Sequence, residues 1–401
     1  MVKYINSQFC IKGFNIPNRV VFQPMEGCDC NNDGSPGDLT REKYIAAAKS
    51  GAGIIWFEAN AVCPEGRTNP RQMMLTRENI GEFKSLIKEM REITEKEGFK
   101  KALYILQLTH SGRQSIKPMI AYRHPIYEEK RPVTDDAIVT DEYLDTLPSL
   151  YADSAKLAYE AGFDGVDVKS CHGYLFQELL SAFSREGRYG GSFKNRTRLY
   201  LDAFRAVKAA IPESMLLTAR ISISDMIEKP YGFGTDENGN LDLSEPDRLL
   251  AMLIDEGLEM LNVTVGNPYF NPHVNRPYRS GGYTPPETAS CGLERFEIIE
   301  EHIKKMFPSL PIVASGLSYY RENPIEKAES ILEKGIADFA GFGRMILAYP
   351  EFYKDYLNGC YSAKKACVTC SKCTVLMRNK CVSGCAVFNE YYRNLYKEKV
   401  K

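Results

Sequence analysis

The stretch E-A-G-F-D-G-V-D-V-K-S-C-H-G-Y, from Glu160 to Tyr174, decides the fold. It begins at the end of an apolar helix pattern and reaches Gly162, a residue type that ends helices in the left-handed conformation. A short apolar strand pattern, Gly165–Cys171, follows almost at once. Such a short link is typical of a helix that returns to a parallel strand. The stretch therefore predicts one step of a repeating strand-and-helix fold.

The same step recurs along the chain, in S-G-A-G-I-I-W-F (50–57), D-E-G-L-E-M-L (255–261) and E-K-G-I-A-D-F-A-G-F (333–342). The predicted strands are Arg19–Met25, Ile54–Val62, Ala102–His110, Gly165–Cys171, Met215–Ser222, Met260–Gly266, Pro311–Gly316 and Ala337–Arg344. Each precedes a segment with apolar residues at helical spacing. These predicted helices are Leu39–Ser50, Asn79–Gly98, Leu147–Ala161, Arg198–Ile211, Pro246–Gly257, Gly292–Phe307, Ile325–Gly335 and Pro350–Asn358. Eight such units in series favour a closed (β/α)8 TIM barrel, of class α/β, over an open doubly wound sheet.

Composition restricts the class of protein. The 401 residues are 44% hydrophobic and 26% charged, with a net charge of −1, so nothing in the overall charge predicts binding to nucleic acid or to an anionic membrane. The first ten residues lack the pattern of a signal peptide, and no apolar run approaches the roughly 20 residues that span a bilayer. We therefore expect a cytoplasmic enzyme with a barrel over residues 1–358 and a short cysteine-rich extension over 359–401.

Candidate site residues follow from the barrel, because barrel active sites lie at the carboxyl ends of the strands. Gly316, Gly343 and Arg344 end the last two strands, where barrels commonly bind phosphate; the glycines could instead close tight turns. Arg220 within a strand indicates a bound anion or an electron-rich ring, or else an ion pair with a carboxylate. Gln107 is suited to the edge of a heterocycle, or to a satisfied amide in the core.

A wider set of motifs occurs in one order along the chain. They are N-R-V-V (18–21) with P-M (24–25), Q-L (107–108) with His110, Gly112 and Arg113, H-G-Y-L (172–175), R-Y-G-G-S (188–192) with N-R (195–196), and G-R (343–344). Together they resemble the old yellow enzyme family of FMN-dependent oxidoreductases, over about residues 5 to 350. The resemblance implies an FMN cofactor. Its ring would be lined by Pro24, Met25, Ala59, Gln107 and Arg220, and its phosphate held by Gly316, Gly343 and Arg344.

The resemblance also implies a reaction, the reduction of an activated C=C bond in an α,β-unsaturated carbonyl or carboxylate. Hydride would pass from N5 of the reduced flavin to the β-carbon, Tyr174 would protonate the α-carbon, and His172 would bind the carbonyl oxygen. Lys169 occupies the place of a usual second histidine, where it could stabilise an enolate, bind a substrate carboxylate or form a structural ion pair. Glu26 stands where relatives have Cys or Thr, and it could tune the flavin or face Lys169 or Arg113.

Five cysteines lie close together near the end of the chain, at Cys367, Cys370, Cys373, Cys381 and Cys385. In a reducing compartment such a cluster favours a metal site over disulfides. The residues alone are compatible with an iron–sulfur cluster, a structural zinc or free thiols. The resemblance favours a 4Fe-4S cluster, because the branch with 2,4-dienoyl-CoA reductase and the bile-acid-inducible enoate reductases carries one after the barrel. We expect Cys367, Cys370, Cys373 and Cys385 as ligands, with Cys381 as the alternative fourth.

Members of that branch continue into a second half that binds FAD and NAD(P)H, and the present sequence has no such half. We therefore expect electrons to come from a separate flavoprotein or ferredoxin, or directly from NAD(P)H. The other functions compatible with the sequence are a flavin-dependent amine dehydrogenase or demethylase, a desaturase, and a non-catalytic electron-transfer subunit. The sequence does not identify the substrate, beyond a weak indication of an aromatic or acidic compound.

Overall fold

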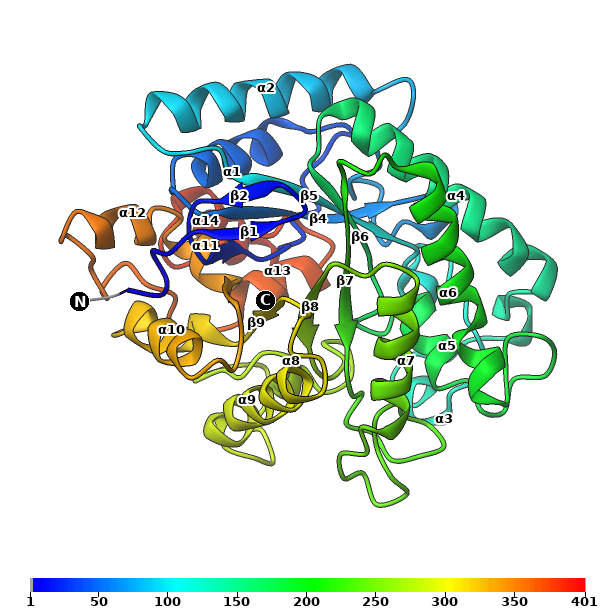
Figure 1. Ribbon diagram of the computed structural model, residues 1–401. Helices are drawn as coiled ribbons and strands as arrows, with labels where there is room; N and C mark the ends of the chain where they lie inside the picture. The colour runs from blue at the N-terminus through cyan, green and yellow to red at the C-terminus, as the bar shows by residue number, and fades with distance from the viewer. Residues whose placement is uncertain (1–2, 401) are drawn as a thin grey trace.

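The computed structural model describes residues 3–400, and its centre is a closed barrel of eight parallel strands in the order β10-β3-β4-β5-β6-β7-β8-β9 (Figure 1). Each predicted strand range contains one of them. The strands are β3 (Val20–Phe22), β4 (Ile54–Ala61), β5 (Leu103–Thr109), β6 (Gly165–Val168), β7 (Leu216–Ser222), β8 (Met260–Thr264), β9 (Ile312–Ala314) and β10 (Phe339–Phe342). The prediction of a (β/α)8 barrel is confirmed.

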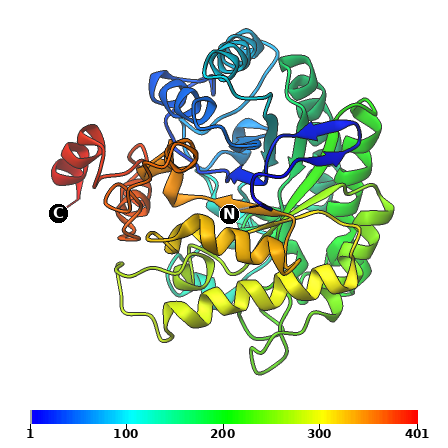
Figure 2. The same ribbon diagram turned by 60° about the vertical axis from the view of Figure 1, so that its left-hand side comes forward.

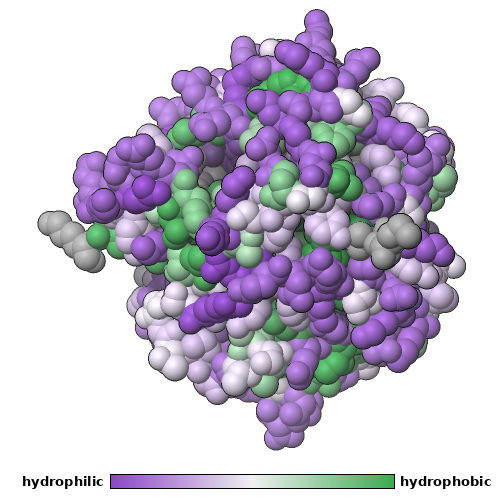
Figure 3. Space-filling model, turned by 90° about the vertical axis from the view of Figure 1, so that its left-hand side faces the viewer, coloured by the Kyte–Doolittle hydropathy of each residue, from purple (hydrophilic) through white to green (hydrophobic). Residues whose placement is uncertain are grey.

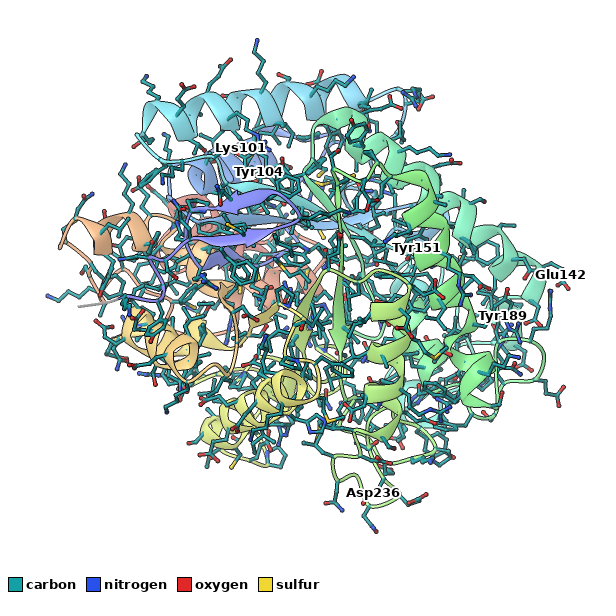
Figure 4. All side chains as sticks on the ribbon, viewed as in Figure 1. Lys101, Tyr104, Glu142, Tyr151, Tyr189 and Asp236 are labelled. Atoms are coloured by element: carbon teal, nitrogen blue, oxygen red, sulfur yellow. The ribbon has the colours of Figure 1, made fainter. Side chains whose placement is uncertain are left out.

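Helices surround the barrel, and each long one returns the chain to the amino end of the next strand (Figures 1 and 2). They are α1 (Asp38–Ala48), α2 (Ile80–Lys96), α4 (Asp141–Ala161), α6 (Phe193–Ala210), α7 (Ser244–Asp255), α9 (Ala289–Met306), α10 (Pro324–Glu333), α11 (Arg344–Ala348) and α12 (Phe352–Leu357). Short helices α3 (Pro125–Glu128), α5 (Leu175–Leu180) and α8 (Pro272–Asn275) lie in the loops that follow β5, β6 and β8. Figure 4 shows Tyr104 and Tyr151 among the packed elements and Glu142 at the outer edge. Both tyrosines are buried between the barrel and its helices.

The third long helix, α4, begins earlier than the predicted range Leu147–Ala161. The predicted start would place Pro148 in the first turn, where proline is common. In the structure α4 begins at Asp141, because the Oγ1 of Thr140 accepts a hydrogen bond from the backbone N–H of Tyr143 at 3.2 Å. This side-chain cap and the acidic residues of the first turn stabilise the helix start, and Pro148 lies inside the helix.

A small antiparallel hairpin was not predicted. Strands β1 (Phe9–Ile11) and β2 (Phe14–Ile16) form it, and Figure 1 shows it in dark blue in front of the barrel strands. Ile16 is fully buried against the inward-facing side chains of the barrel, including Trp56 and Phe339. The hairpin therefore supplies apolar contacts to the inner core, at the end opposite the strand ends that carry the candidate site.

An irregularity in β4 directs side chains near the candidate site. The register against β5 shifts between Phe57 and Ala59, so Glu58 has no partner there. Such a bulge redirects the residues that follow it. Phe57 and Glu58 both face α1, where Phe57 stacks on Tyr44 and Glu58 accepts a hydrogen bond from the Tyr44 hydroxyl at 3.3 Å. Ala59 then returns to the cavity at the barrel mouth.

The carboxyl-terminal segment carries two more helices, α13 (Lys372–Arg378) and α14 (Glu390–Lys399). Figure 2 shows this segment in orange and red beside the barrel, with α14 at the edge of the molecule. The face drawn in Figure 3 is mainly hydrophilic, with hydrophobic residues in separate patches. Among residues 3–400, no helix combines the length and the apolarity needed to cross a membrane.

Candidate functional site

The mouth of the barrel holds a cavity with an empty volume of about 1140 Å³. Every residue that the sequence predicts for catalysis or FMN binding lines it. These residues are Pro24, Met25, Ala59, Gln107, Lys169, His172, Tyr174, Arg220, Gly316, Gly343 and Arg344. They come from seven of the eight strands and their loops, which explains how positions distant in sequence meet at one place. We call this space the inner cavity.

A tight left-handed turn after β6 aims two of these side chains. His172 and Gly173 have φ angles of +67° and +68°. This region is unusual for a residue other than glycine, and it disfavours any side chain at position 173. A Cβ added to Gly173 would also lie 2.2 Å from the side-chain nitrogen of Asn267. The turn is therefore fixed by its surroundings, and it places His172 and Tyr174 in the same cavity.

Tyr174 is buried, and its hydroxyl donates a hydrogen bond to Oε2 of Glu26 at 3.1 Å. The ammonium of Lys169 lies 3.7 Å from the centre of the Tyr174 ring. Burial, and next the charge of Glu26, raise the pKa of Tyr174 well above its usual value. The phenol is therefore held in its protonated form, as a proton donor requires. Of the alternatives open for Glu26, the one facing Arg113 is wrong, because Arg113 pairs with Glu178 at 2.5 Å.

The Nε2 of His172 and the side chain of Lys169 are both buried, and few polar contacts offset the cost of removing them from water. Burial, and then the positive charges of Lys169 and Arg220, lower the pKa of His172 well below its usual value. The imidazole is therefore neutral, and its Nε2 has no hydrogen-bond partner. Burial likewise lowers the pKa of Lys169, whose nearest charges include Glu26 and Arg220. Two polar groups that face a cavity without partners are suited to a ligand oxygen.

Gln107 and Arg220, on the two strands that flank β6, are both held by one buried carboxylate, Asp167. Oδ2 of Asp167 accepts hydrogen bonds from Gln107 Nε2 at 2.6 Å and from Trp56 Nε1 at 2.9 Å. Its Oδ1 accepts from the backbone N–H of Arg220 at 2.7 Å. Gln107 is thus oriented by its amide nitrogen, and its oxygen remains available as an acceptor. The Nε of Arg220 is buried and has no partner, so this guanidinium has capacity for a bound group.

Positive charge gathers at the end of the inner cavity beside β9 and β10. Arg344 and Arg276 each carry a buried nitrogen without a partner, Nη1 and Nε respectively. Burial, and then the charges of Arg378 and Arg344, lower the pKa of Arg276 to about 10. Arg344 is buried, Arg276 is half-buried and Arg378 is exposed, and three guanidinium groups gathered at one end of a cavity suit an anion between them. The sequence assigned only Arg344 to this place. Arg276 and Arg378 were missed as ligands because they lie in a loop and in the tail.

The glycines here leave room for close approach of a ligand. A Cβ on Gly343 would lie 3.0 Å from Sδ of Met25, and Gly316 has a φ of +83°. The preceding Ser315 is anchored by its Oγ, which donates to the carbonyl of Val263 at 2.6 Å. The absence of side chains, the three arginines and the width of the cavity fit a flavin phosphate at this end. The residues present therefore suit FMN.

Other motif residues lie outside the inner cavity and have structural contacts. The Nδ1 of His110 accepts from the Gly112 N–H at 3.1 Å, and its Nε2 lies 2.9 Å from the Tyr143 hydroxyl. Burial lowers the pKa of His110 to about 4. Ser192 caps α6 by accepting a hydrogen bond from the N–H of Asn195 at 3.3 Å. These positions stabilise loops and helix ends around the mouth.

The cysteine-rich segment adjoins the inner cavity, and Cys373 forms part of its wall. Cys367 and Cys385 each lie close enough to Cys373 for its charge to raise their pKa, and Cys385 also lies near Cys370. Sγ of Cys367 accepts the Thr369 N–H at 3.3 Å. Sγ of Cys381 instead contacts the carbonyl of Asn379 at 3.5 Å. Among residues 3–400 all cysteines are free, and no three metal-ligating side chains converge on one point.

Comparison with known proteins places the chain in a family. NADH oxidase from Thermoanaerobacter brockii is 28% identical over 368 residues, which are 89% of this chain and 51% of that protein. Cinnamate reductase from Clostridium sporogenes is 28% identical over 393 residues, which are 93% of this chain and 55% of that protein. The chain thus spans about half the length of these relatives. The structure of 2-naphthoyl-CoA reductase with 2-naphthoyl-CoA matches with a TM-score of 0.80 at 19% identity, covering 99% of this chain and 58% of that one.

The family model described as "NADH:flavin oxidoreductase / NADH oxidase family" matches residues 8–266, which include six of the eight barrel strands and the predicted catalytic residues. This match extends over more than half of the chain. The chain therefore belongs to the NADH:flavin oxidoreductase / NADH oxidase family.

Proposed function

We propose that this flavin oxidoreductase uses FMN to reduce the activated C=C bond of an α,β-unsaturated carbonyl or carboxylate. The observation that carries the proposal is the meeting of Tyr174, His172 and Lys169 with all eight predicted FMN-binding residues in one cavity. A relative named cinnamate reductase supports the same class of substrate. Bound FMN would supply the hydride that reaches the β-carbon of the substrate.

The eight predicted FMN-binding residues would contact different parts of the cofactor. Gly316, Gly343 and Arg344 would hold the phosphate, where Arg344 has an unpartnered nitrogen. Pro24, Met25 and Ala59 would contact the ring, with Gln107 and Arg220 at its polar edge. A cation beside the ring also stabilises the negative charge of a reduced flavin.

The substrate would be oriented by its oxygen. Neutral His172 donates a hydrogen bond to that oxygen, and Lys169 adds positive charge where the enolate forms. Tyr174 then gives its hydroxyl proton to the α-carbon. Because the phenol is buried and donates to Glu26, we propose that this carboxylate takes up a proton from the solvent side and passes it to the phenolate after each turnover. Oε1 of Glu26 in turn accepts from the Thr68 hydroxyl at 3.3 Å, on the way to a wider, more open cavity.

We propose that Cys367, Cys370, Cys373 and Cys385 hold a 4Fe-4S cluster. Their grouping and the N–H donor to Cys367 support this assignment, since such donors stabilise thiolates bound to a cluster. The cluster would supply electrons one at a time, from a separate flavoprotein or ferredoxin. The position of Cys373 in the cavity wall would bring it beside the flavin site. Direct reduction by NAD(P)H is the alternative that the donor assay below distinguishes.

The activity is tested with protein purified and reconstituted with FMN under anaerobic conditions. Reduced protein is mixed with cinnamate or an enone, oxidised protein is mixed with an amine, and flavin absorbance is followed in both. We expect the unsaturated acid or ketone to reoxidise the flavin. Reduction of the oxidised flavin by the amine, without reoxidation by any alkene, would overturn the proposal in favour of an amine dehydrogenase. Adding NADH, NADPH or a reduced ferredoxin to the oxidised protein separates the electron donors.

The cofactor assignment has its own test. Replacing Arg344 with Gln should weaken FMN binding at least tenfold, since a charge-assisted contact to the phosphate is lost. Binding of riboflavin, which lacks the phosphate, should change little. Equal losses for the two flavins would place the phosphate elsewhere. Titration of the flavin-free protein, followed by flavin fluorescence, measures both affinities.

A further inference from the structure

The guanidinium of Arg344 is held by the loop that follows β8. Its Nη2 donates a hydrogen bond to the carbonyl of Pro277 at 2.7 Å, while its Nη1 is buried and has no hydrogen-bond partner within residues 3–400. Pro277 is buried, so this bond is shielded from water and is stronger than it would be at the surface. The direction in which Arg344 presents its free nitrogen therefore depends on where Pro277 lies.

The same loop is attached to the cysteine-rich segment through Thr369. The backbone N–H of Arg279 donates to Oγ1 of Thr369 at 3.1 Å, and the N–H of Ser280 donates to its carbonyl at 3.5 Å. Arg279 and Ser280 are exposed, as are residues 281–284, and the Arg279 side chain pairs with Glu322 in contact with solvent, where an ion pair adds little stability. Thr369 is thus a buried anchor at the point where the loop reaches the protein surface.

The position of Thr369 is itself fixed. This residue is 1% exposed, and its N–H donates to Sγ of Cys367 at 3.3 Å. Its φ angle is +49°, a left-handed conformation that β-branched residues rarely adopt. Such a conformation persists only where the surrounding structure determines it, and it occurs most often beside functional sites. The hydroxyl of Thr369 is therefore presented to the loop from a backbone with little freedom to move.

We propose that Thr369 is a positioning residue for flavin binding. By holding the loop at Arg279 it keeps the carbonyl of Pro277 in place, and that carbonyl orients Arg344 toward the flavin phosphate. Thr369 does not line the inner cavity, so it acts on the flavin through the loop and not by contact. This role rests on the proposed FMN site, but it does not depend on whether the neighbouring cysteines hold a cluster.

Titration of the flavin-free, full-length chain with FMN and with riboflavin tests this role. The two flavins differ only in the phosphate, so the ratio of their dissociation constants isolates the contribution of the phosphate contacts. Thr369→Val removes the hydroxyl and keeps the shape, and we expect it to lower the preference for FMN about five- to tenfold, through the loss of one buried hydrogen bond. Riboflavin should bind within twofold of the wild type. An unchanged preference would overturn the proposal. An equal loss for both flavins would also overturn it, because it would reveal a general structural role.

Further variants show whether Thr369 acts through Arg344. Thr369→Ser keeps the hydroxyl and should restore most of the preference for FMN, whereas Thr94→Val, which removes a buried hydroxyl bonded within α2, should leave that preference unchanged. In a chain that already carries Arg344→Gln, Thr369→Val should weaken FMN binding less than twofold further, because the group that it positions is gone. A full additional loss would refute the role of Thr369 alone. Equal affinity of the wild type for FMN and riboflavin would instead overturn the proposed phosphate site, and this role with it.

Discussion

Replacement of Tyr174 with Phe removes one oxygen atom from the proposed reaction path and little else. The ring keeps its burial and its contact with Lys169, because both depend on the ring and not on the hydroxyl. The hydroxyl's hydrogen bond to Glu26 is lost, together with its contact with the hydroxyl of Tyr269. That carboxylate lies 3.1 Å from the place of the missing hydroxyl, and we expect it to replace the phenol poorly as a proton donor.

The expected loss of turnover follows from the burial of the Tyr174 hydroxyl. A positioned proton donor contributes roughly 10²- to 10⁴-fold to the rate. Tyr174 is 2% exposed, so bulk water replaces it poorly. We therefore expect Tyr174→Phe to lower turnover about 10³-fold, which is about 4 kcal/mol in the activation barrier. Substrate binding should change little, since the oxygen of the substrate is held by His172 and Lys169.

The assay is anaerobic stopped-flow mixing of reduced enzyme with a series of enones and enoates. Glu26→Gln serves as the intermediate variant, and we expect a smaller loss, about tenfold, because Tyr174 keeps its own proton but regains it slowly. The raised pKa of Tyr174 also predicts the pH dependence of turnover. Turnover should persist at pH 10, where an ordinary phenol would be half ionised. Turnover of Tyr174→Phe within twofold of the wild type would refute its role as proton donor.

Three further predictions follow from the buried charges. His172 has a lowered pKa and stays neutral, so the pH profile between about pH 6 and 8 should be the same in wild type and His172→Asn; a limb that disappears in the variant would contradict this. Cys385→Ser should lose bound iron while Cys381→Ser retains it, and the reverse iron contents would exchange the two ligands. Lys43→Met should lower the free energy of unfolding by about 3–5 kcal/mol, because it leaves the buried carboxylates of Asp29 and Glu58 without their cation. Burial raises the pKa of Glu58 to about 7, so the loss of unfolding free energy, measured by urea denaturation, should grow as the pH rises from 5 to 8. A loss that does not change with pH would refute this account.

The barrel and its strand-end residues could be predicted because the strand topology alone determines where those residues lie. Once eight strands run parallel in a closed barrel, their carboxyl ends must meet at one mouth. Gln107, Tyr174 and Arg344 therefore lie together although they are far apart in sequence. The repeating pattern of apolar strand, helix and terminal glycine was enough to establish that topology.

The remaining parts of the site depend on loops, whose paths have no periodic signal. Arg276 and Arg378 reach the inner cavity from the loop after β8 and from the tail, and only tertiary contacts bring them beside Arg344. The partner of Glu26 was also beyond the sequence, which suggested Lys169 or Arg113, whereas the structure places Tyr174 there. The bulge at Glu58 could not be placed from the sequence, because the polar residues that interrupt the apolar run at 58 and 60 do not identify a shift of register.

The tail is better described as a wall of the active site than as an appendage. The N–H of Ser383, between the last two cysteines, donates to the carbonyl of Gly27 at 2.7 Å. The N–H of Gly27 donates to Oε2 of buried Glu58, also at 2.7 Å. The loop that carries Glu26 is thus held between the cysteine-rich segment and the second barrel strand. Because Glu26 bonds the phenol of Tyr174, we expect a movement of the cysteine-rich segment to reach the proposed proton donor through two hydrogen bonds.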